Sequence, residues 1–263
     1  MRIPRVIVPG AAPGTSPELS SASFRHLVRV LRRNPGDPLV VLDGQGGVFQ
    51  AAVESVDAGR ETLRVRVGDP LAVSPRAGAS LSVAVAIPRG DGLEVALRWG
   101  SEMGLERLIP LLTARGVVRA PRGEKAGRWN KLERWRRIAR EAAEQCRRAA
   151  PLVVDPPAGF ADIIGRAADF PSRWIAVPGG ADLPRSGLLE DLLVPASQVL
   201  VMVGPEGGFD SGELESAAAA GFEAVGFPTH VLRTATAVAY LGVLASLGDF
   251  RAVESQKSKV TYF

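Results

Sequence analysis

The sequence is poor in the residues that build disulfides and metal sites. It contains one cysteine, Cys146, and two histidines, His26 and His230. A single cysteine excludes an internal disulfide framework, and so few Cys and His residues argue against a structural metal. We therefore expect no metal ion.

Long apolar segments are also missing. No run of about 18 apolar residues, the length needed to cross a membrane as a helix, occurs in the chain. The opening Met1-Arg-Ile-Pro-Arg5 lacks the apolar region of a signal peptide. The sequence predicts a cytoplasmic protein with no membrane partner.

What the chain does have is enough apolar content for a core and an uneven charge. It has 263 residues, of which 46% are hydrophobic, and a net charge of +4. Residues 119–148 hold eleven Lys or Arg against four Glu, whereas residues 151–251 hold twelve Asp or Glu against five Arg. Such a basic sector favours a nucleic-acid partner, although a salt-bridged surface helix would give the same count.

The N-terminal part reads as a small antiparallel barrel. Three short runs rich in β-formers, Pro38–Leu42, Val48–Val53 and Thr62–Val67, are separated by turn residues. Ahead of them, residues 26–33 show helical spacing, with Leu27, Val30 and Leu31 on one face and arginines largely on the other. The arginine face is either an RNA contact or an ordinary solvated surface.

From about residue 79, apolar strands alternate with helical patterns, which favours a parallel sheet covered on both faces. The candidate strands are Leu81–Ile87, Arg107–Leu112, Trp174–Val177, Val199–Val203 and Ala224–Phe227. The clearest helical pattern is residues 129–148, and a last long helix is expected over residues 236–250.

Two turns at strand ends predict a ligand site. The stretch Val201-Met-Val-Gly-Pro-Glu-Gly-Gly-Phe-Asp210 leaves a strand, turns on three glycines and restarts as a helix that Asp210 or Ser211 can cap. It is neither a P-loop nor a dinucleotide-binding turn. Residues 230–236 form a second strand-to-helix turn with one cation, Arg233. Open α/β sheets bind ligands at such positions, although both turns could be plain connections.

Five segments occur in order along the chain: Met1-Arg-Ile-Pro-Arg5, Ser101-Glu-Met-Gly104, Glu141-Ala-Ala-Glu-Gln-Cys146, Gly204-Pro-Glu-Gly-Gly-Phe209 with Glu213 downstream, and Val231-Leu-Arg-Thr-Ala-Thr-Ala237. Together they resemble the ribosomal RNA small subunit methyltransferase E family of the SPOUT superfamily. The glycine turn alone would be weak support, whereas five collinear segments are specific.

The resemblance implies an α/β fold in three parts. Residues 1–73 would form a PUA-like β-barrel that binds RNA, residues 74–252 a SPOUT methyltransferase domain with a deep trefoil knot, and residues 253–263 a flexible tail. Such proteins are homodimers that use S-adenosylmethionine to methylate N3 of a uridine in 16S ribosomal RNA, with free RNA or the assembled 30S subunit as substrate.

The resemblance also implies the site residues. The cofactor would lie against Val177, Pro178, Gly179, Val203, Gly204, Pro205, Glu206, Gly207, Gly208, Phe227, Val231, Leu232, Thr234 and Thr236. Arg233 would stabilise charge that develops on the base, and Glu206 is either the general base or a brace for the loop. The arginines expected to position RNA are Arg2, Arg5, Arg25, Arg29, Arg32 and Arg89, with residues 119–128 as support.

The chain departs from the family pattern at the cofactor rim. Ala235 stands where the family usually has a glutamate, and Phe227-Pro-Thr-His230 replaces a usual Leu-Gly-x-Arg. A second hypothesis is therefore a catalytically weakened SPOUT-fold protein that binds RNA or assists ribosome assembly. A third is a small-molecule or nucleotide enzyme unrelated to RNA.

Overall fold

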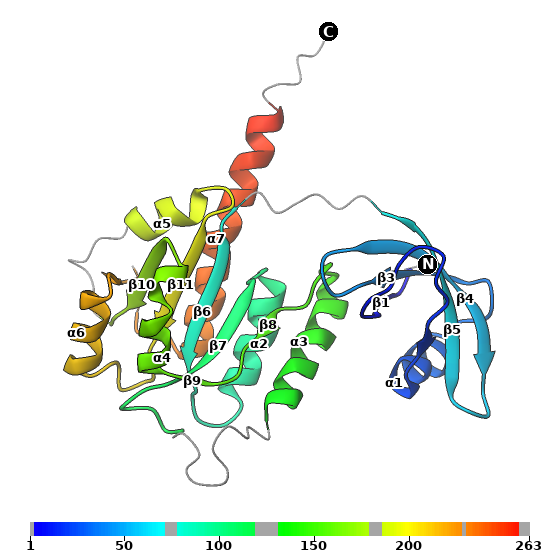
Figure 1. The fold of residues 1–263 in the computed structure, drawn as a ribbon, viewed down its shortest axis with the longest axis horizontal. Coiled ribbons are helices and arrows are strands. Elements are labelled where there is room, and N and C mark those ends of the chain that lie inside the picture. The colour runs from blue at the N-terminus through cyan, green and yellow to red at the C-terminus, as the bar shows by residue number, and fades with distance from the viewer. Residues whose placement is uncertain (1–2, 72–77, 119–130, 179–185, 228–229, 258–263) are drawn as a thin grey trace. The chain divides into compact units, whose positions relative to one another are not determined.

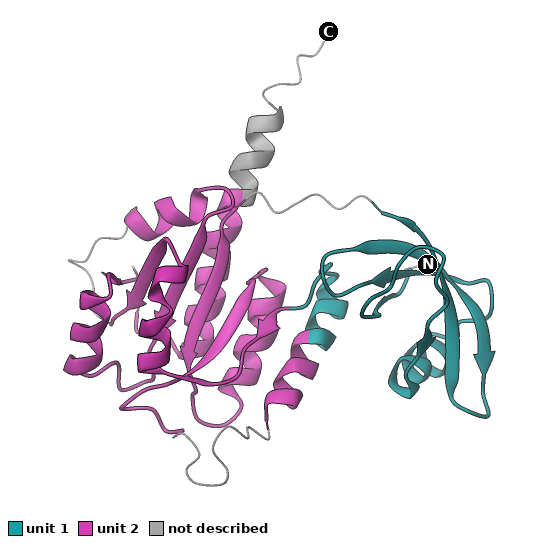
Figure 2. Ribbon diagram, viewed as in Figure 1, with its two compact units in different colours: residues 1–75, 140–151 teal, residues 76–139, 152–263 magenta. Residues whose placement is uncertain are grey.

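The computed structural model describes residues 3–71, 78–118, 131–178, 186–227 and 230–257, and only the backbone of residues 186 and 249–257. The chain divides into two compact units, coloured separately in Figure 2. Unit 1 comprises Met1–Pro75 and Arg140–Pro151, and unit 2 comprises Arg76–Ala139 and Leu152–Phe263. Residues 140–151 thus group with unit 1, which helical periodicity alone does not indicate.

Unit 1 is built on a five-stranded sheet. Its strands are β1 (Arg5–Ile7), β2 (Glu18–Leu19), β3 (Pro38–Leu42), β4 (Val48–Asp57) and β5 (Thr62–Pro70), in the spatial order β1-β3-β4-β5-β2. The predicted antiparallel runs are β3, β4 and β5. The sheet is not wholly antiparallel, however, because β1 pairs with β3 in parallel.

The core of unit 1 follows the alternation of its strands. Leu63, Val65 and Val67 of β5 are at most 1% exposed, because alternate residues of a strand face the same side. Phe24 and Leu27 cover this core from the helical segment.

The helical segment of unit 1 differs from the predicted α-helix. A short helix α1 (Ser21–Phe24) continues as a π-helix, η1 (Arg25–Val30), which ends in a bond from Leu31 N–H to the His26 carbonyl. The prediction that Val30 and Leu31 share the buried face of Leu27 is wrong, since they are 68% and 38% exposed. The wider π-turn rotates them off that face.

Unit 2 contains the predicted parallel sheet. Its strands are β6 (Ser80–Ala86), β7 (Arg107–Leu112), β8 (Val153–Val154), β9 (Ala158–Gly159), β10 (Ser172–Ala176), β11 (Gln198–Val203) and β12 (Glu223–Val225). The spatial order is β12-β10-β11-β6-β7-β8, and β9 pairs with β7 beyond the end of β8 in the sequence. Every pair of strands is parallel. All strands therefore end at one edge.

Helices cover both faces of this sheet (Figure 1). The helices α2 (Gly92–Glu102), α3 (Leu132–Cys146), α5 (Ser186–Leu193) and α7 (Thr234–Lys257) contribute to one apolar core. The other core receives α4 (Phe160–Gly165), the 3-10 turn η3 (Ala167–Asp169) and α6 (Ser211–Ala219). Two cores on opposite faces explain why β6 and β11 are almost continuously apolar.

The C-terminal helix is longer than its sequence pattern indicates. It begins at Thr234 and runs to Lys257, which places residues 253–257 of the expected tail in a helix. Among the described residues, no helix combines the length and the apolar character needed to cross a bilayer.

Candidate functional site

The predicted site residues of unit 2 lie on three loops at one edge of the sheet. The loops follow β10, β11 and β12, which are neighbours in the order β12-β10-β11. The backbone N–H of Val177 bonds to the Val225 carbonyl at 3.0 Å, which ties the first loop to β12. Loop residues that are far apart in the sequence, such as Val177, Gly204 and Thr234, therefore lie at one edge of the sheet. Open α/β sheets bind ligands at this edge.

The glycine turn after β11 has its own structural reasons for glycine. A Cβ on Gly204 would come within 3.1 Å of the Phe209 ring, and Gly208 has a φ of +67° with no atom within 4 Å of its ideal Cβ. The helix α6 then begins with the predicted cap, since the Asp210 side chain accepts the Glu213 N–H at 2.7 Å. Gly204 makes room for packing, and Gly208 supplies a left-handed backbone.

Two side chains that the sequence analysis did not assign to this role, Glu213 and Arg115, brace this turn. The buried carboxylate of Glu213 accepts N–H bonds from Asp210 at 3.0 Å and from Ala114, in the loop after β7, at 2.7 Å. The Arg115 guanidinium donates to the Gly207 carbonyl at 3.0 Å. The loop after β7 therefore fixes the loop after β11.

The third loop, after β12, presents an exposed apolar residue, Val231. Val231 is 81% exposed, whereas Leu232 packs on the core and Thr234 is 5% exposed. Phe227, before the loop, packs on Tyr240 of α7 with ring centres 5.1 Å apart and ring planes inclined at 51°. Within the described ranges, the backbone of Val231 and Leu232 forms no hydrogen bond, so these groups can serve a ligand.

The remaining predicted residues take the following positions. Val203 and Pro205 are buried, Val177, Gly204, Gly208, Phe227 and Thr236 are half-buried, and Pro178, Glu206, Gly207 and Arg233 are exposed. Gly179 lies outside the described residues. The Glu206 side chain makes no hydrogen bond to any described part of the protein, so the brace of this loop is Glu213. Among the described residues no group of acids, Cys or His could hold a metal ion.

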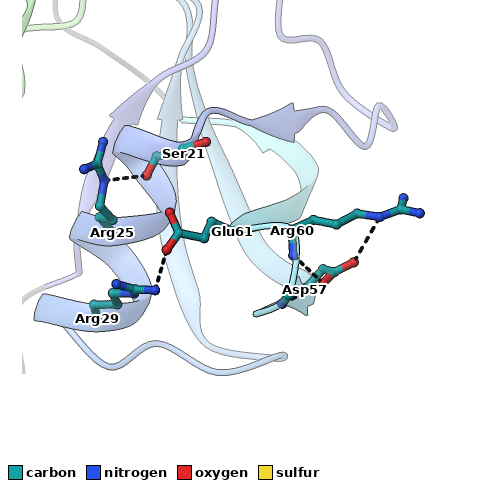
Figure 3. Close-up of polar contacts among 7 residues, drawn as sticks. Ser21, Arg25, Arg29, Asp57, Arg60 and Glu61 are labelled. Atoms are coloured by element: carbon teal, nitrogen blue, oxygen red, sulfur yellow. Dashed lines mark hydrogen bonds and ion pairs between the residues drawn. The ribbon is translucent and has the colours of Figure 1, made fainter.

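The predicted RNA-binding arginines of unit 1 are partly engaged (Figure 3). Arg25 Nε donates to the Ser21 carbonyl at 3.3 Å, and Arg29 forms an ion pair with Glu61. Arg5 donates to the Arg147 carbonyl at 3.0 Å, and Arg32 is exposed with a φ of +53°. Arg89 belongs to unit 2, and Arg2 and residues 119–128 lie outside the described residues.

Unit 1 also contains a carboxyl group with a shifted pKa. Burial raises the pKa of Glu144, although a 3.2 Å hydrogen bond from the Ile7 N–H and the charges of His26 and Arg140 oppose the shift. The Glu144 carboxylate, through its bond with Ile7, joins β1 to the last turn of α3. Neither residue belongs to the three loops after β10, β11 and β12.

Comparison with known proteins gives the family. A family model for an RNA methyltransferase domain matches residues 76–246, and one for an RNA methyltransferase PUA domain matches residues 19–66. The ribosomal RNA small subunit methyltransferase E of Synechocystis is 34% identical over 224 residues, covering 83% of this chain and 69% of that protein. The chain belongs to the ribosomal RNA small subunit methyltransferase E family. The family predicted from five sequence segments is thereby confirmed.

Other relatives cover more of the family's length. The methyltransferase E of Mycobacterium bovis is 32% identical over 242 residues, covering 90% of this chain and 89% of the relative. A protein from Legionella pneumophila, named as a methyltransferase and solved with the cofactor SAM, is 28% identical with a TM-score of 0.78, covering 94% and 98% of the two chains. These likenesses confirm the α/β fold with an N-terminal PUA-like domain.

A methyltransferase E from Neisseria gonorrhoeae, solved with S-adenosyl methionine, has the same fold. Its TM-score is 0.79 at 24% identity, covering 94% of this chain and 98% of that one. At this identity the likeness concerns the fold alone.

Sequence reasoning missed Glu213 as a brace, although one signal was present. Asp210-x-x-Glu213 has the spacing of a capping box, in which the side chains of the cap and the third helical residue bond to each other's backbone. No comparable signal marks Arg115, because its contact joins positions 92 residues apart.

Proposed function

We propose that this member of the methyltransferase E family is an S-adenosylmethionine-dependent enzyme that methylates N3 of one uridine in 16S ribosomal RNA. The names of its relatives support ribosomal RNA of the small subunit as the substrate. The structural observation that carries the proposal is that three loops, after β10, β11 and β12, lie at one edge of the sheet, and that the Val231 and Leu232 backbone forms no hydrogen bond to the described residues.

The residues present suit the cofactor. Adenine needs a few fixed donors and acceptors beside an apolar surface, and the loop at residues 231–232 offers both. Bound S-adenosylmethionine supplies a methyl group on a sulfonium, so that transfer is an in-line displacement that depends on alignment. A rigid turn at residues 204–208, braced by Glu213 and Arg115, meets that need.

The acceptor chemistry assigns tasks to two exposed side chains. The N3–H proton of uridine must leave as the new bond forms, and negative charge then spreads over the base. Arg233, at the end of the third loop, orients the base and stabilises that charge. The carboxylate of Glu206, which faces solvent, is the candidate acceptor for the proton.

The proposal extends to domain roles. Residues 1–73 form the PUA-like RNA-binding domain, residues 74–252 the SPOUT domain with a trefoil knot, and the end of the chain a tail. The match of residues 19–66 to an RNA methyltransferase PUA domain supports the first role. The exposed Arg25 and Arg32 would contact phosphates, which position RNA without reading its sequence. The protein would work in the cytoplasm.

The active form is a homodimer in this proposal. Val243 and Leu247 of α7 are 46% and 39% exposed and, four residues apart, share one face of the helix. Such an exposed apolar face suits an interface. Val238 and Leu241 are fully buried and belong to the core of the protomer.

A catalytically weakened RNA-binding or assembly protein is the second candidate. It is favoured by Ala235, which packs against the apolar core of unit 2 at the start of α7, where the family usually has a carboxylate.

Methyl transfer from labelled S-adenosylmethionine to small ribosomal subunits from cells without this protein would separate the two. We expect label on one uridine with the wild type and its loss with Arg233→Ala. Arg166→Ala, which removes an arginine that pairs with Asp155 and belongs to none of the three loops, should keep the label. No label with intact cofactor binding in calorimetry would favour the second candidate. Weak RNA binding that does not vary with salt would point to a small-molecule enzyme.

A further inference from the structure

A cavity of about 350 Å³ lies in unit 2, apart from the three loops of the proposed cofactor site. It is bounded by the turn after β6, the start of α2, the end of the loop after β7 and the start of α3. The lining includes Ile87, Arg89, Leu93, Val117, Lys131 and Trp135. None of them is a predicted cofactor residue.

The cavity opens at the edge of the sheet where the proposed site lies. β6 and β7 run parallel to β11, so the residues that follow them reach the same edge as Gly204 and its neighbours. RNA bound along this edge would pass both places.

The walls of the cavity are mainly apolar. Ile87, Leu93 and Trp135 are at most 6% exposed, while Val117 is 47% exposed at its rim. Its volume falls in the range of small-molecule pockets, about 300–1,000 Å³, and suits a flat group of the size of a nucleobase.

The described residues that line the cavity carry a net positive charge. The acid among them, Glu94, is bound by Nε and Nη2 of Arg134, each contact being 2.9 Å. Arg89 and Lys131 are exposed at the rim. A ligand with an apolar flat body and a negative charge is therefore favoured, since the pair Glu94–Arg134 is already neutral.

We propose that this cavity holds an unstacked nucleotide of the RNA substrate, with the base against the apolar wall and its phosphate beside Arg89 and Lys131. The inference rests on the proposed function and adds to it a second RNA contact, which anchors the RNA without holding the reacting base. Proteins that read single-stranded RNA commonly capture such splayed bases.

Variants that fill or neutralise the cavity test this. Val117→Trp fills it from an exposed position, and Arg89→Ala with Lys131→Ala removes its cations. The control for Val117→Trp is Val194→Trp, which changes a valine of similar exposure, 50%, before the amino end of β11. The control for the charge variants is Arg166→Ala. Binding of a transcribed small-subunit RNA domain is measured by filter assay, cofactor binding by calorimetry, and kcat at saturating RNA.

We expect Val117→Trp to weaken RNA binding about tenfold, the usual effect of losing one base contact. The double variant should lower the slope of log affinity against log salt by about 0.7–0.9, for the one phosphate that lies beside both cations. The cofactor affinity and the melting temperature should not change in any of these variants, and both controls should match the wild type in RNA affinity and in kcat.

Other outcomes would overturn the inference. Unchanged RNA binding in Val117→Trp would mean that the cavity takes no RNA. A fall in kcat with unchanged RNA affinity would place the reacting base there. Binding of uridine monophosphate that Val117→Trp abolishes, without any loss of RNA affinity, would identify a free nucleotide as the ligand. If the wild type bound no RNA, the proposed function itself would fail.

Discussion

The buried carboxylate of Glu213 accepts a hydrogen bond of 2.7 Å from the backbone N–H of Ala114, 99 residues earlier in the chain. Its second oxygen accepts the Asp210 N–H at 3.0 Å. One side chain on α6 thus ties the glycine turn after β11 to the loop after β7. This contact helps to fix the geometry of the turn, in addition to its glycines.

Replacing Glu213 should loosen the turn. Glu213→Ala leaves two part-buried N–H groups without their acceptor, which should lower the free energy of unfolding by about 1–3 kcal/mol in all. Urea unfolding followed by tryptophan fluorescence measures this, because all four tryptophans lie in unit 2. Cofactor affinity should fall as well. Glu215→Ala changes an exposed glutamate of the same helix and is the control; equal effects of the two variants would contradict the role of Glu213.

Two glycine substitutions should act in opposite directions. Gly208→Ala forces a side chain into a left-handed backbone at φ +67°, which should destabilise unit 2 by about 1–2 kcal/mol and weaken cofactor binding. Gly165→Ala, at the last residue of α4 with open space around its ideal Cβ, should stabilise by about 0.5–1 kcal/mol. Thermal unfolding with and without the cofactor measures both. A stabilising Gly208→Ala would rule out the conformational argument.

The elements that the sequence predicts well are those with a strong local pattern. Pro38–Leu42 and Arg107–Leu112 were predicted with the bounds of β3 and β7, because each is an apolar run between turn residues. The strands β8 and β9 have two residues each and carry no pattern. The π-helix η1 was missed because its residues also fit a period of 3.6.

The same limit applies to the site. Glycine and proline mark the turn at residues 204–208, and the strand order β12-β10-β11 places it at the same edge of the sheet as the loop at residues 231–233. The contacts of Ala114 and Arg115 with this turn, and the cavity beside Trp135, depend on loops that are distant in sequence. Local patterns hold no information on such contacts.

The ion pair of Arg29 with Glu61 should restrain RNA binding. Glu61→Gln frees the guanidinium, and since exposed pairs contribute about 0–1 kcal/mol, RNA affinity should rise up to about fivefold. The slope of log affinity against log salt should steepen by about 0.7–0.9, for one added phosphate contact. Filter binding at several salt concentrations measures both. The double variant Glu61→Gln with Arg29→Ala should not show the increase in RNA affinity. If the increase persisted in the double variant, Arg29 would not be its source.

The raised pKa of Glu144 predicts a pH dependence of stability. Burial is the main cause, and the facing groups are His26, Arg140, Glu141 and the Ile7 N–H. Because the folded protein holds this proton more tightly than the unfolded chain, the stabilising contribution is complete below the unfolded pKa. It is lost as the pH rises through the folded pKa.

Glu144→Gln keeps an acceptor for the Ile7 N–H but does not ionise, so it should gain stability relative to the wild type as the pH rises from about 4 to about 8. Unit 1 contains no tryptophan, and calorimetric unfolding is therefore the suitable measurement. Glu133→Gln, which removes a carboxylate with 76% exposure from the same helix, should show no such trend. A constant difference between Glu144→Gln and the wild type across this range would mean that Glu144 is ionised equally in the folded and unfolded states.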